Sequence, residues 1–298
     1  METVLITGGS GLIGQALSHL LTQEGYAVRH LSRTVKGNEE YATFKWDLNQ
    51  NELDSKALEN VNHIIHLAGE NVGEGRWTTA RKKRILSSRV DTIALLQSKL
   101  KPKQLKSFIS ASGISYYGSK TTTNIFNETD PEGTDFLADI SVQWEQKAFE
   151  MESFSDRVLA LRTGVVLSSK GGALEKLKKP IKMGIGSALG SGKQYMPWIH
   201  IKDLCNLYLE ALQNTNLVGC YNSVSSQHTT NLEMTQAVAK VFRKKLWAPK
   251  VPAFVLKMLF GEMAQIILQG SRIDNSKIKA TGFKLEFETL ESALDDLL

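Results

Sequence analysis

The chain has few residues of several kinds, and each shortage excludes a class of protein. Only two of the 298 residues are cysteines, Cys205 and Cys220, which excludes a disulfide framework and matches no metal-site spacing. No apolar stretch reaches the roughly 20 residues that span a bilayer. The most apolar segment, 251–268, contains Pro252 and charged residues and is predicted to be an amphipathic helix. No signal-peptide pattern and no internal repeat is found, and we expect a cytoplasmic protein.

The chain also has little excess charge of one sign, with a formal net charge of only +5. The basic residues nevertheless gather in the segments 81–84, 99–106 and 176–182. Aromatic side chains are not interleaved with these clusters, so no nucleic-acid partner is expected, and neither is a membrane. We interpret the clusters as solvated helix faces, with an anionic small molecule as the alternative partner.

The strongest positive signal is the glycine-rich segment 7–14, Thr-Gly-Gly-Ser-Gly-Leu-Ile-Gly. It follows the apolar run 4–6 and precedes a helical pattern, and this strand–turn–helix context makes the motif specific for dinucleotides. The glycines allow a tight turn, a close approach of the backbone to a pyrophosphate and close packing of the helix on the sheet. The residues expected at the pyrophosphate are Gly8, Gly9, Gly11, Leu12, Ile13 and Gly14.

The residue that ends the second apolar run indicates which dinucleotide is bound. NAD-specific chains usually place an acidic residue about 20 positions after the glycine motif, where it binds the ribose 2′-hydroxyl. Here Arg33 follows the run 27–32, and Glu39 and Glu40 come too late. A guanidinium suits a 2′-phosphate, so NADP(H) is favoured over NAD(H); the alternative is a solvated surface arginine.

The order of predicted elements defines the fold class. Apolar strands alternate with helical patterns as far as residue 165; strands are predicted at 27–32, 44–48, 63–69, 108–112 and 157–162, and helices at 76–100 and 139–151. This order predicts an α/β protein in which residues 1–165 form a Rossmann-type, doubly wound parallel sheet that binds NADP(H). Residues 166–298 are expected to form a smaller, mixed substrate domain, with part of 195–225 returning to the first domain.

Several motifs together resemble one family across nearly the whole chain. They are 7–14, His66–Asn71, Ser110–Ser112 before Tyr116–Gly118, Trp144–Glu145, Arg162–Leu167 and Trp198–Asp203. This set is similar to atypical or extended short-chain dehydrogenases/reductases, and more narrowly to the sugar-nucleotide-epimerase-like "epimerase family" proteins. The segment at about 247–295 resembles that family's C-terminal domain.

The resemblance implies further cofactor-binding residues. Asp47 and Leu48 would lie at the adenine, while Leu67, Ala68 and Gly69 would line the adenosine ribose, and the backbone after Thr163 would approach the nicotinamide. Ser110, Val165 and Arg89 complete the implied set, with Arg89 at the place of the family's usual structural asparagine. His66 has an equal alternative as a buried histidine at the end of a strand.

The chain departs from the family at the catalytic pair. Working members carry Tyr-x-x-x-Lys on a helix, where the lysine adjusts the pKa of the tyrosine. In this sequence Leu137 and Ser141 take these two positions. The one Tyr-x-x-x-Lys present, Tyr116 to Lys120, contains Gly118 and is predicted to lie in a loop.

Two hypotheses about function follow. In the first, the protein is an oxidoreductase or epimerase acting on a carbonyl or alcohol, with a nucleotide sugar as one candidate substrate. Ser112, Tyr116 and Tyr117 are then the candidate catalytic residues, and His200 and Lys193 the candidate substrate contacts. In the second, the protein binds NADP(H) without catalysis, as a sensor or partner-binding protein, and the two tyrosines only pack. Homo-oligomerisation is compatible with both hypotheses.

Overall fold

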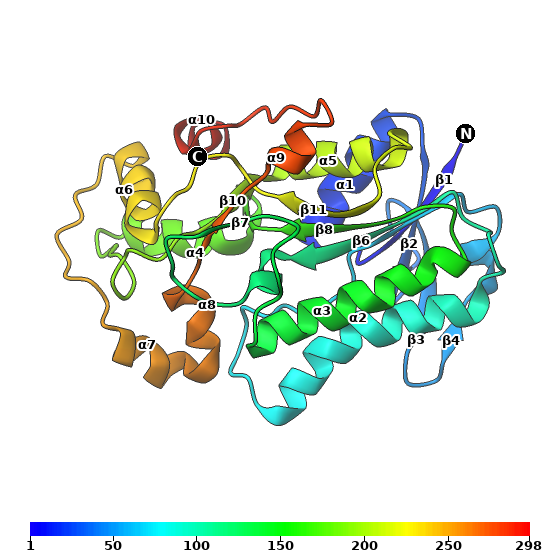
Figure 1. Cartoon of the computed structure of the whole chain (residues 1–298), viewed down its shortest axis with the longest axis horizontal. Helices are drawn as coiled ribbons and strands as arrows, with labels where there is room; N and C mark the ends of the chain where they lie inside the picture. Colours follow the sequence, from blue (N-terminus) through cyan, green and yellow to red (C-terminus); the bar gives the residue numbers. More distant parts are fainter.

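An eight-stranded sheet forms the centre of the computed structural model, which describes all 298 residues (Figure 1). Its strand order is β11-β8-β6-β5-β1-β2-β3-β4, and every neighbouring pair is parallel except β3 and β4. The strands are β1 (Thr3–Thr7), β2 (Ala27–Ser32), β3 (Ala42–Asp47), β4 (Glu52–Leu53), β5 (His63–His66), β6 (Ser107–Gly113), β8 (Val158–Thr163) and β11 (Gly219–Ser223). The predicted α/β fold with a Rossmann-type parallel sheet is confirmed.

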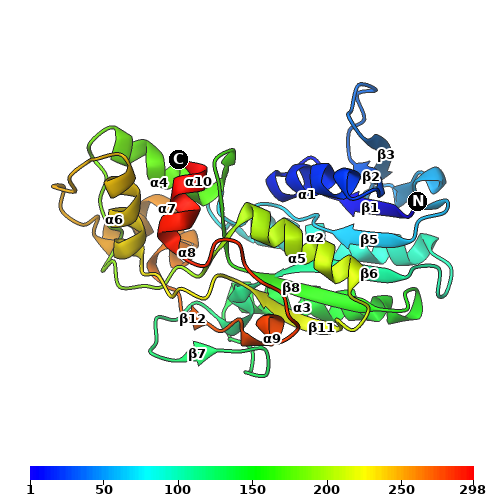
Figure 2. The same cartoon turned by 90° about the horizontal axis from the view of Figure 1, so that it is seen from above.

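Helices cover both faces of this sheet, which is why its central strand β1 is buried at every position rather than at alternate ones. Helices α1 (Leu12–Gln23) and α5 (Ile201–Gln213) pack on one face, and α2 (Thr79–Lys99) and α3 (Phe136–Phe149) on the other (Figure 2). Each pair of helices shares a separate apolar core with the sheet. The three residues at the centre of β1, Val4 to Ile6, are fully buried between these cores.

The strand order reverses direction at β1, which lies between β2 and β5. From β1 the chain proceeds outward through β2 to β3, then returns to add β5, β6 and β8 on the other side. Such a switch point opens a crevice at the carboxyl ends of the two central strands, and this is where ligands bind in open α/β sheets. The segments at this crevice are the glycine-rich turn after β1 and residues 67–69 after β5.

A smaller unit is built beside the carboxyl ends of the main sheet. Its core gathers around Trp198 from two parallel strands and three helices: β9 (Val165–Ser168), β10 (Trp198–His200), α4 (Gly172–Lys182), α6 (Asn231–Val241) and α10 (Leu290–Leu297). Short elements complete the chain: α7 (Ala253–Phe260), α8 (Ala264–Leu268), α9 (Ser276–Lys279), the strand pair β7 (Ile125–Phe126) and β12 (Arg272–Ile273), and 3-10 helices η1 (Ser55–Leu58), η2 (Ile114–Tyr117), η3 (Glu150–Ser153) and η4 (Gly261–Met263).

Two helices differ from their predictions for local reasons. The single amphipathic helix predicted over 253–268 is divided, because Gly261 adopts a φ of +62° that ends α7 before η4 and α8 begin. The sequence pattern also predicts a helix over 232–244, but α6 ends at Val241, just before Arg243 with its φ of +52°. No helix of the structure combines the length and the apolar character needed to cross a bilayer.

Candidate cofactor and substrate site

The turn after β1 is packed so tightly that only glycine fits. A Cβ atom at Gly14 would lie 2.5 Å from the carbonyl oxygen of Gly8, and one at Gly9 would lie 2.4 Å from the ring of His30. Gly8 has a φ of +74°, and the N–H of Gly11 donates to its carbonyl oxygen at 3.0 Å. The turn therefore exposes backbone rather than side chains at the switch point, as a pyrophosphate requires.

The helix that follows this turn begins without a side-chain cap. Gly11 is the N-cap of α1, so no side chain accepts from the first N–H groups of the helix. Free N–H groups and the positive end of the helix dipole attract an anion. Leu12 and Ile13 lie in this first turn, partly buried. The predicted pyrophosphate residues thus form one cradle.

Residues after β5 close the other side of the crevice. A Cβ atom at Gly8 would lie 3.0 Å from the backbone of Leu67 and Ala68, so the two loops approach closely. Thr7 Oγ1 accepts from the Ala68 N–H at 3.2 Å and fixes their spacing. His66 is fully buried, with Nε2 2.9 Å from Thr92 Oγ1, and burial lowers its pKa to about 3. His66 is therefore a neutral core histidine.

The residue predicted to select NADP(H) over NAD(H) follows β2, and the residues predicted to bind the adenine lie at the end of β3. Arg33 follows β2 directly, is exposed, and makes no hydrogen bond or ion pair within the protein. Asp47 ends β3, where its Oδ1 accepts from the N–H of Asn49 at 2.9 Å, while Leu48 packs at the edge of the core. The Arg33 guanidinium is thus available to a ligand, whereas one oxygen of Asp47 is used by its own turn.

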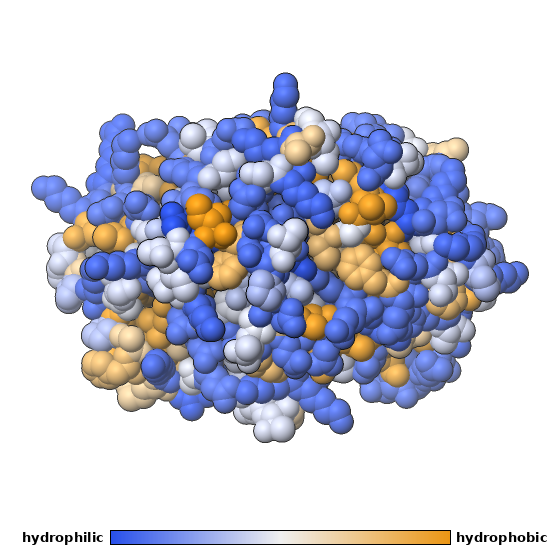
Figure 3. All heavy atoms as spheres, in the orientation of Figure 1, coloured by the Kyte–Doolittle hydropathy of each residue, from blue (hydrophilic) through white to orange (hydrophobic).

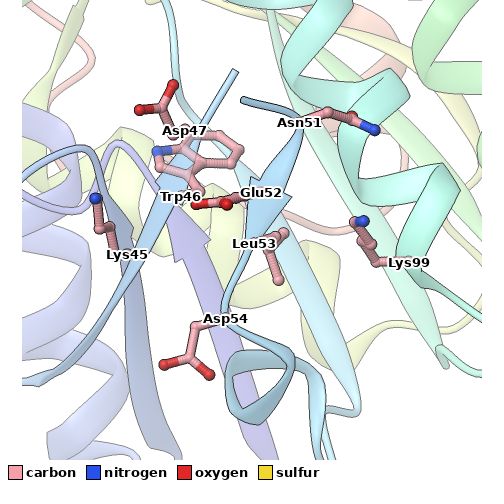
Figure 4. A pocket seen from close by; sticks show the side chains of 8 residues that line it. All are labelled: Lys45, Trp46, Asp47, Asn51, Glu52, Leu53, Asp54 and Lys99. Carbon is pink, nitrogen blue, oxygen red and sulfur yellow. The ribbon is translucent and has the colours of Figure 1, made fainter. Parts of the chain in front are cut away.

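A pocket of about 360 Å³ lies at the β3–β4 hairpin, at the outer edge of the sheet (Figure 4). Lys99, the last residue of α2, stands across from the seven lining residues of the hairpin region. The pocket is lined by three carboxylates and two lysines. Asp47 is its only lining residue that is also predicted to bind the cofactor. This pocket is therefore separate from the glycine cradle.

A buried arginine packs against the crevice from α2. The Arg89 guanidinium donates to the carbonyl oxygens of Ile85 at 2.8 Å and Glu70 at 3.1 Å, and it stacks 4.9 Å from the Trp144 ring centre. A Cβ atom at Gly69 would lie 2.9 Å from the guanidinium carbon, so Gly69 makes room for it. No carboxylate pairs with Arg89, and burial lowers its pKa to about 10, which leaves it charged near neutral pH.

The residues at the ends of β6, β8 and β11 form a buried polar network. Ser112 Oγ donates to Glu145 Oε1 at 2.6 Å, and Arg162 binds both oxygens of Glu145 at 2.8 Å. Arg162 also donates to the Tyr117 hydroxyl at 2.9 Å, which in turn donates to Asn222 Oδ1 at 2.8 Å. Sequence reasoning missed Glu145 as a site residue, although an acid on the buried face of α3 and an arginine in an apolar strand were the available signal.

Comparison with known proteins gives this geometry a family. Residues 4–224 match the NAD dependent epimerase/dehydratase family, and residues 251–297 match DUF1731, a domain of unknown function. The chain belongs to the NAD dependent epimerase/dehydratase family. This confirms the predicted epimerase-family resemblance and its C-terminal domain.

Relatives in the family align along their whole length. Epimerase family protein SDR39U1 from Mus musculus is 34% identical over 99% of this chain and 99% of its own, and YfhF from Bacillus subtilis is 31% identical over 99% and 97%. The crystal structure of human SDR39U1 with NADPH is similar with a TM-score of 0.88, at 30% identity over 99% and 98% of the two chains. A UDP-glucuronic acid 4-epimerase from Bacillus cereus shares the fold alone, with a TM-score of 0.80 at 19% identity over 98% and 96%.

The two residues predicted to stand at the positions of the tyrosine–lysine pair lie on α3. Leu137 and Ser141 lie one turn apart on α3; Leu137 packs in an apolar cluster with Trp77 and Met263, and Ser141 Oγ lies 2.9 Å from Ser115 Oγ. Tyr116 and Lys120 do not share a helix, because η2 ends at Tyr117 and Gly118 has a φ of +83°. Leu137 therefore offers no exchangeable proton, and Tyr116 and Lys120 are not brought onto one helix face.

The two candidate tyrosines occupy different surroundings. Tyr117 is buried, its proton is donated to Asn222, and burial raises its pKa to about 12. These contacts engage the Tyr117 hydroxyl within the protein, so the geometry favours a structural role for Tyr117 over the predicted catalytic one. Tyr116 is only partly buried, and its ring covers the Arg162 guanidinium at 3.4 Å. Ser112 and Tyr116 stay as the catalytic candidates.

The predicted substrate residues do not meet at the crevice. His200 is fully buried, accepts from the Lys202 N–H at 3.1 Å as the cap of α5, and stacks on Phe287 at 3.8 Å. This placement favours a structural role for His200 over the predicted substrate contact. Lys193 lies exposed on the loop between α4 and β10.

The last predicted cofactor residues lie at strand ends beside the network. Ser110 is buried in β6, and its hydroxyl donates to the Ala111 carbonyl at 2.9 Å. Thr163 ends β8 and donates to the Leu161 carbonyl, and Val165 begins β9. Ser110 thus has its hydroxyl engaged by the protein, whereas Thr163 and Val165 flank Gly164, where backbone passes the carboxyl edge of the sheet.

Proposed function

We propose that this protein binds NADP(H) in the crevice between β1 and β5 and acts as an oxidoreductase or epimerase-like enzyme on a carbonyl or alcohol. The observation that carries the proposal is the glycine cradle, in which added side chains would collide and which opens onto the uncapped start of α1. These residues fit a dinucleotide pyrophosphate. The nicotinamide of a bound cofactor would supply the hydride chemistry.

The preference for the phosphorylated cofactor rests on Arg33. Its guanidinium has no partner within the protein and follows the strand whose end faces the adenosine ribose in this fold. A guanidinium can bind a 2′-phosphate through two charge-assisted hydrogen bonds. The human relative crystallised with NADPH supports the same choice.

The reacting end of the site is proposed to be organised by Ser112. Its hydroxyl proton is donated to Glu145, so only the oxygen lone pairs are left for a ligand. Ser112 therefore accepts a hydrogen bond from the hydroxyl of an alcohol, and Arg162 holds Glu145 in place through both carboxylate oxygens. Tyr116, partly exposed beside them, is the candidate proton donor for a carbonyl.

A second candidate function, binding of NADP(H) without turnover, is favoured by Leu137 and Ser141. Neither side chain can replace the tyrosine–lysine pair, because leucine carries no exchangeable proton and serine carries no charge. Two free cysteines fit a reducing compartment, and the cytoplasm is the proposed location for either function.

Titration with NADPH and NADH, followed by nicotinamide fluorescence, tests the cofactor. Arg33→Glu should weaken NADPH binding about 10- to 100-fold, since it removes charge-assisted hydrogen bonds and adds repulsion, and should leave NADH binding unchanged. Lys36→Glu, a matched exposed charge reversal three residues away, is the control. Equal effects of both variants, or no binding of either nucleotide, would contradict the proposal.

Turnover separates the two candidate functions once binding is established. Oxidation of NADPH with a panel of carbonyl compounds, abolished by Ser112→Ala, would support the enzyme. Binding without turnover of any carbonyl or nucleotide sugar would support the sensor.

A further inference from the structure

Helix α7 turns an apolar stripe toward the outside of the molecule. Phe254 and Met258, one turn apart, are 71% and 65% exposed, and the next residue, Leu259, is also exposed. The opposite side of the helix faces inward through Leu256, which is only 4% exposed. Figure 3 shows apolar side chains gathered at the lower left of the surface, where Figure 1 draws α7.

The loop before α7 adds an exposed tryptophan. Trp247 is 72% exposed, whereas the other four tryptophans of the chain, Trp46, Trp77, Trp144 and Trp198, are all buried. An aromatic side chain this large is rarely left in water without a partner, because its burial is worth several times that of a small side chain. Because only residues 248–252 separate Trp247 from the start of α7, we take Trp247 and the α7 stripe together as one candidate contact surface.

Every charged residue of this surface is a cation. Between residues 241 and 260 the chain carries five basic residues and no Asp or Glu: Arg243, Lys244, Lys245, Lys250 and Lys257. All five are exposed, and none forms an ion pair within the protein. Apolar and aromatic side chains beside unpaired cations are the composition of segments that lie at the surface of an anionic bilayer.

Polar contacts from the main domain fix this surface in its outward orientation. Arg76 donates to the backbone carbonyls of Met258 and Leu259 at the end of α7. Lys82 pairs with Glu262 in the turn that follows. Both partners come from the segment leading into α2 or from α2 itself, so the base of α7 is attached to the Rossmann domain while its stripe faces solvent.

We propose that residues 243–259 form a docking surface for an anionic phospholipid bilayer. Trp247, Phe254 and Met258 would enter the headgroup region, and the five cations would contact lipid phosphates. The charge argues against a second copy of this chain, because a symmetric contact would bring like charges together. The aliphatic side chains argue against a nucleic acid, whose bases need aromatic platforms. This proposal revises the expectation of no membrane partner.

Tryptophan emission of the full-length protein tests the proposal directly. Because four tryptophans are already buried, a blue shift on adding vesicles reports the transfer of Trp247 out of water. We expect the shift with vesicles of phosphatidylcholine mixed with phosphatidylglycerol, its loss at high salt, and no shift with phosphatidylcholine alone. No shift with the anionic vesicles, or an equal shift with the neutral ones, would overturn the proposal.

Matched variants test whether vesicle binding depends on residues 243–259 or only on the net positive charge of the protein. The triple variant Arg243→Glu, Lys244→Glu, Lys245→Glu should weaken binding to anionic vesicles, measured by sedimentation, by ~100-fold or more, since each cation near the surface contributes about a fivefold factor and the three factors multiply. Phe254→Ser with Met258→Ser should also weaken it. Lys83→Glu, Lys99→Glu, Lys101→Glu changes the same charge elsewhere and should retain binding. Unchanged NADPH binding in each variant checks folding.

Two other partners of this surface, a second copy of the chain or a nucleic acid, would give different results in these experiments. If Phe254→Ser with Met258→Ser instead dissolves a dimer seen by analytical ultracentrifugation, the surface belongs to a second copy. If duplex or single-stranded RNA displaces the vesicles and shifts Trp247 by itself, the surface binds nucleic acid. Either result overturns the lipid proposal and leaves the proposed cofactor site untouched.

Discussion

Glu145 on α3 and Arg162 on β8 form a two-pronged ion pair in the interior, with side-chain exposures of 7% and 4%. Burial disfavours the charge of Arg162, but Glu145 outweighs this effect, and the pKa of the guanidinium is raised above its usual value. The pair connects a helix to a strand and holds Ser112 and Tyr117 at its two ends.

Removing one partner of this pair should destabilise the protein strongly. Glu145→Gln leaves an uncompensated buried guanidinium, and we expect a loss of about 3–5 kcal/mol in the free energy of unfolding, measured by urea denaturation. The double variant Glu145→Leu with Arg162→Met should recover most of that loss, because no charge is then left unpaired. If the unfolding free energy of Glu145→Gln lies within about 1 kcal/mol of the wild-type value, the pair contributes no more than a surface ion pair and must be solvated.

Substitution of Gly14 should abolish cofactor binding. A methyl group at this position would lie 2.5 Å from a backbone oxygen of the turn, so Gly14→Ala must displace either the turn or α1. We expect NADPH binding to be lost in a fluorescence titration. Gly73→Ala, whose Cβ would meet only the Asn71 side chain at 3.4 Å, should bind normally. Normal binding by Gly14→Ala would show that the cradle does not contact the cofactor.

His200 should be one of the buried histidines that make the protein less stable as the pH is lowered below about 6.5. Burial lowers the pKa of His200 to about 4 in the folded protein, against the ordinary value of about 6.5 when unfolded. Below pH 6.5 the unfolded chain gains a proton that the folded chain does not, so the unfolding free energy decreases until about pH 4. His200→Asn keeps a side chain that can cap α5 and should reduce the decrease by about 3 kcal/mol. Identical pH profiles for the two proteins would assign the effect to other groups.

Placing the family's usual tyrosine and lysine at positions 137 and 141 should not increase turnover. Leu137 packs against Trp77, Ile140 and Met263, so Leu137→Tyr with Ser141→Lys overfills this cluster and should destabilise the protein by about 1–3 kcal/mol. We expect no rise in carbonyl reduction, measured as NADPH oxidation. Leu137→Met, which conserves volume, should cost less than about 1.5 kcal/mol. A gain in turnover would mean that the tyrosine position still faces the nicotinamide.

The fold was predictable because its signals are local. The glycine turn, the apolar strands and the alternation with helices are each contained within short segments, and the structure places them in one parallel sheet. The break at Gly261 was harder, since an amphipathic pattern continues across it and only the positive φ ends the helix.

The reacting end of the site was less predictable because it depends on distant contacts. Ser112, Glu145 and Arg162 meet only when β6, α3 and β8 are packed together. His200 follows a short strand like a site residue, yet its neighbour Phe287 comes from near the end of the chain. No local pattern distinguishes a histidine that caps a helix in a core from one that faces a ligand.

The path of the chain between its two units limits how they can move. It crosses from the main sheet to β9 at Gly164, returns through His200 into α5, and leaves again after Ser223. These crossings are hydrogen-bonded side by side, from Gly164 N–H to the Ser223 carbonyl and from Ser225 N–H to the Trp198 carbonyl. A single linker would leave both bending and twisting free. Bonded crossings, together with Ile278 and Leu285, which return to the core of the main sheet before α10 joins the smaller unit, restrain both motions.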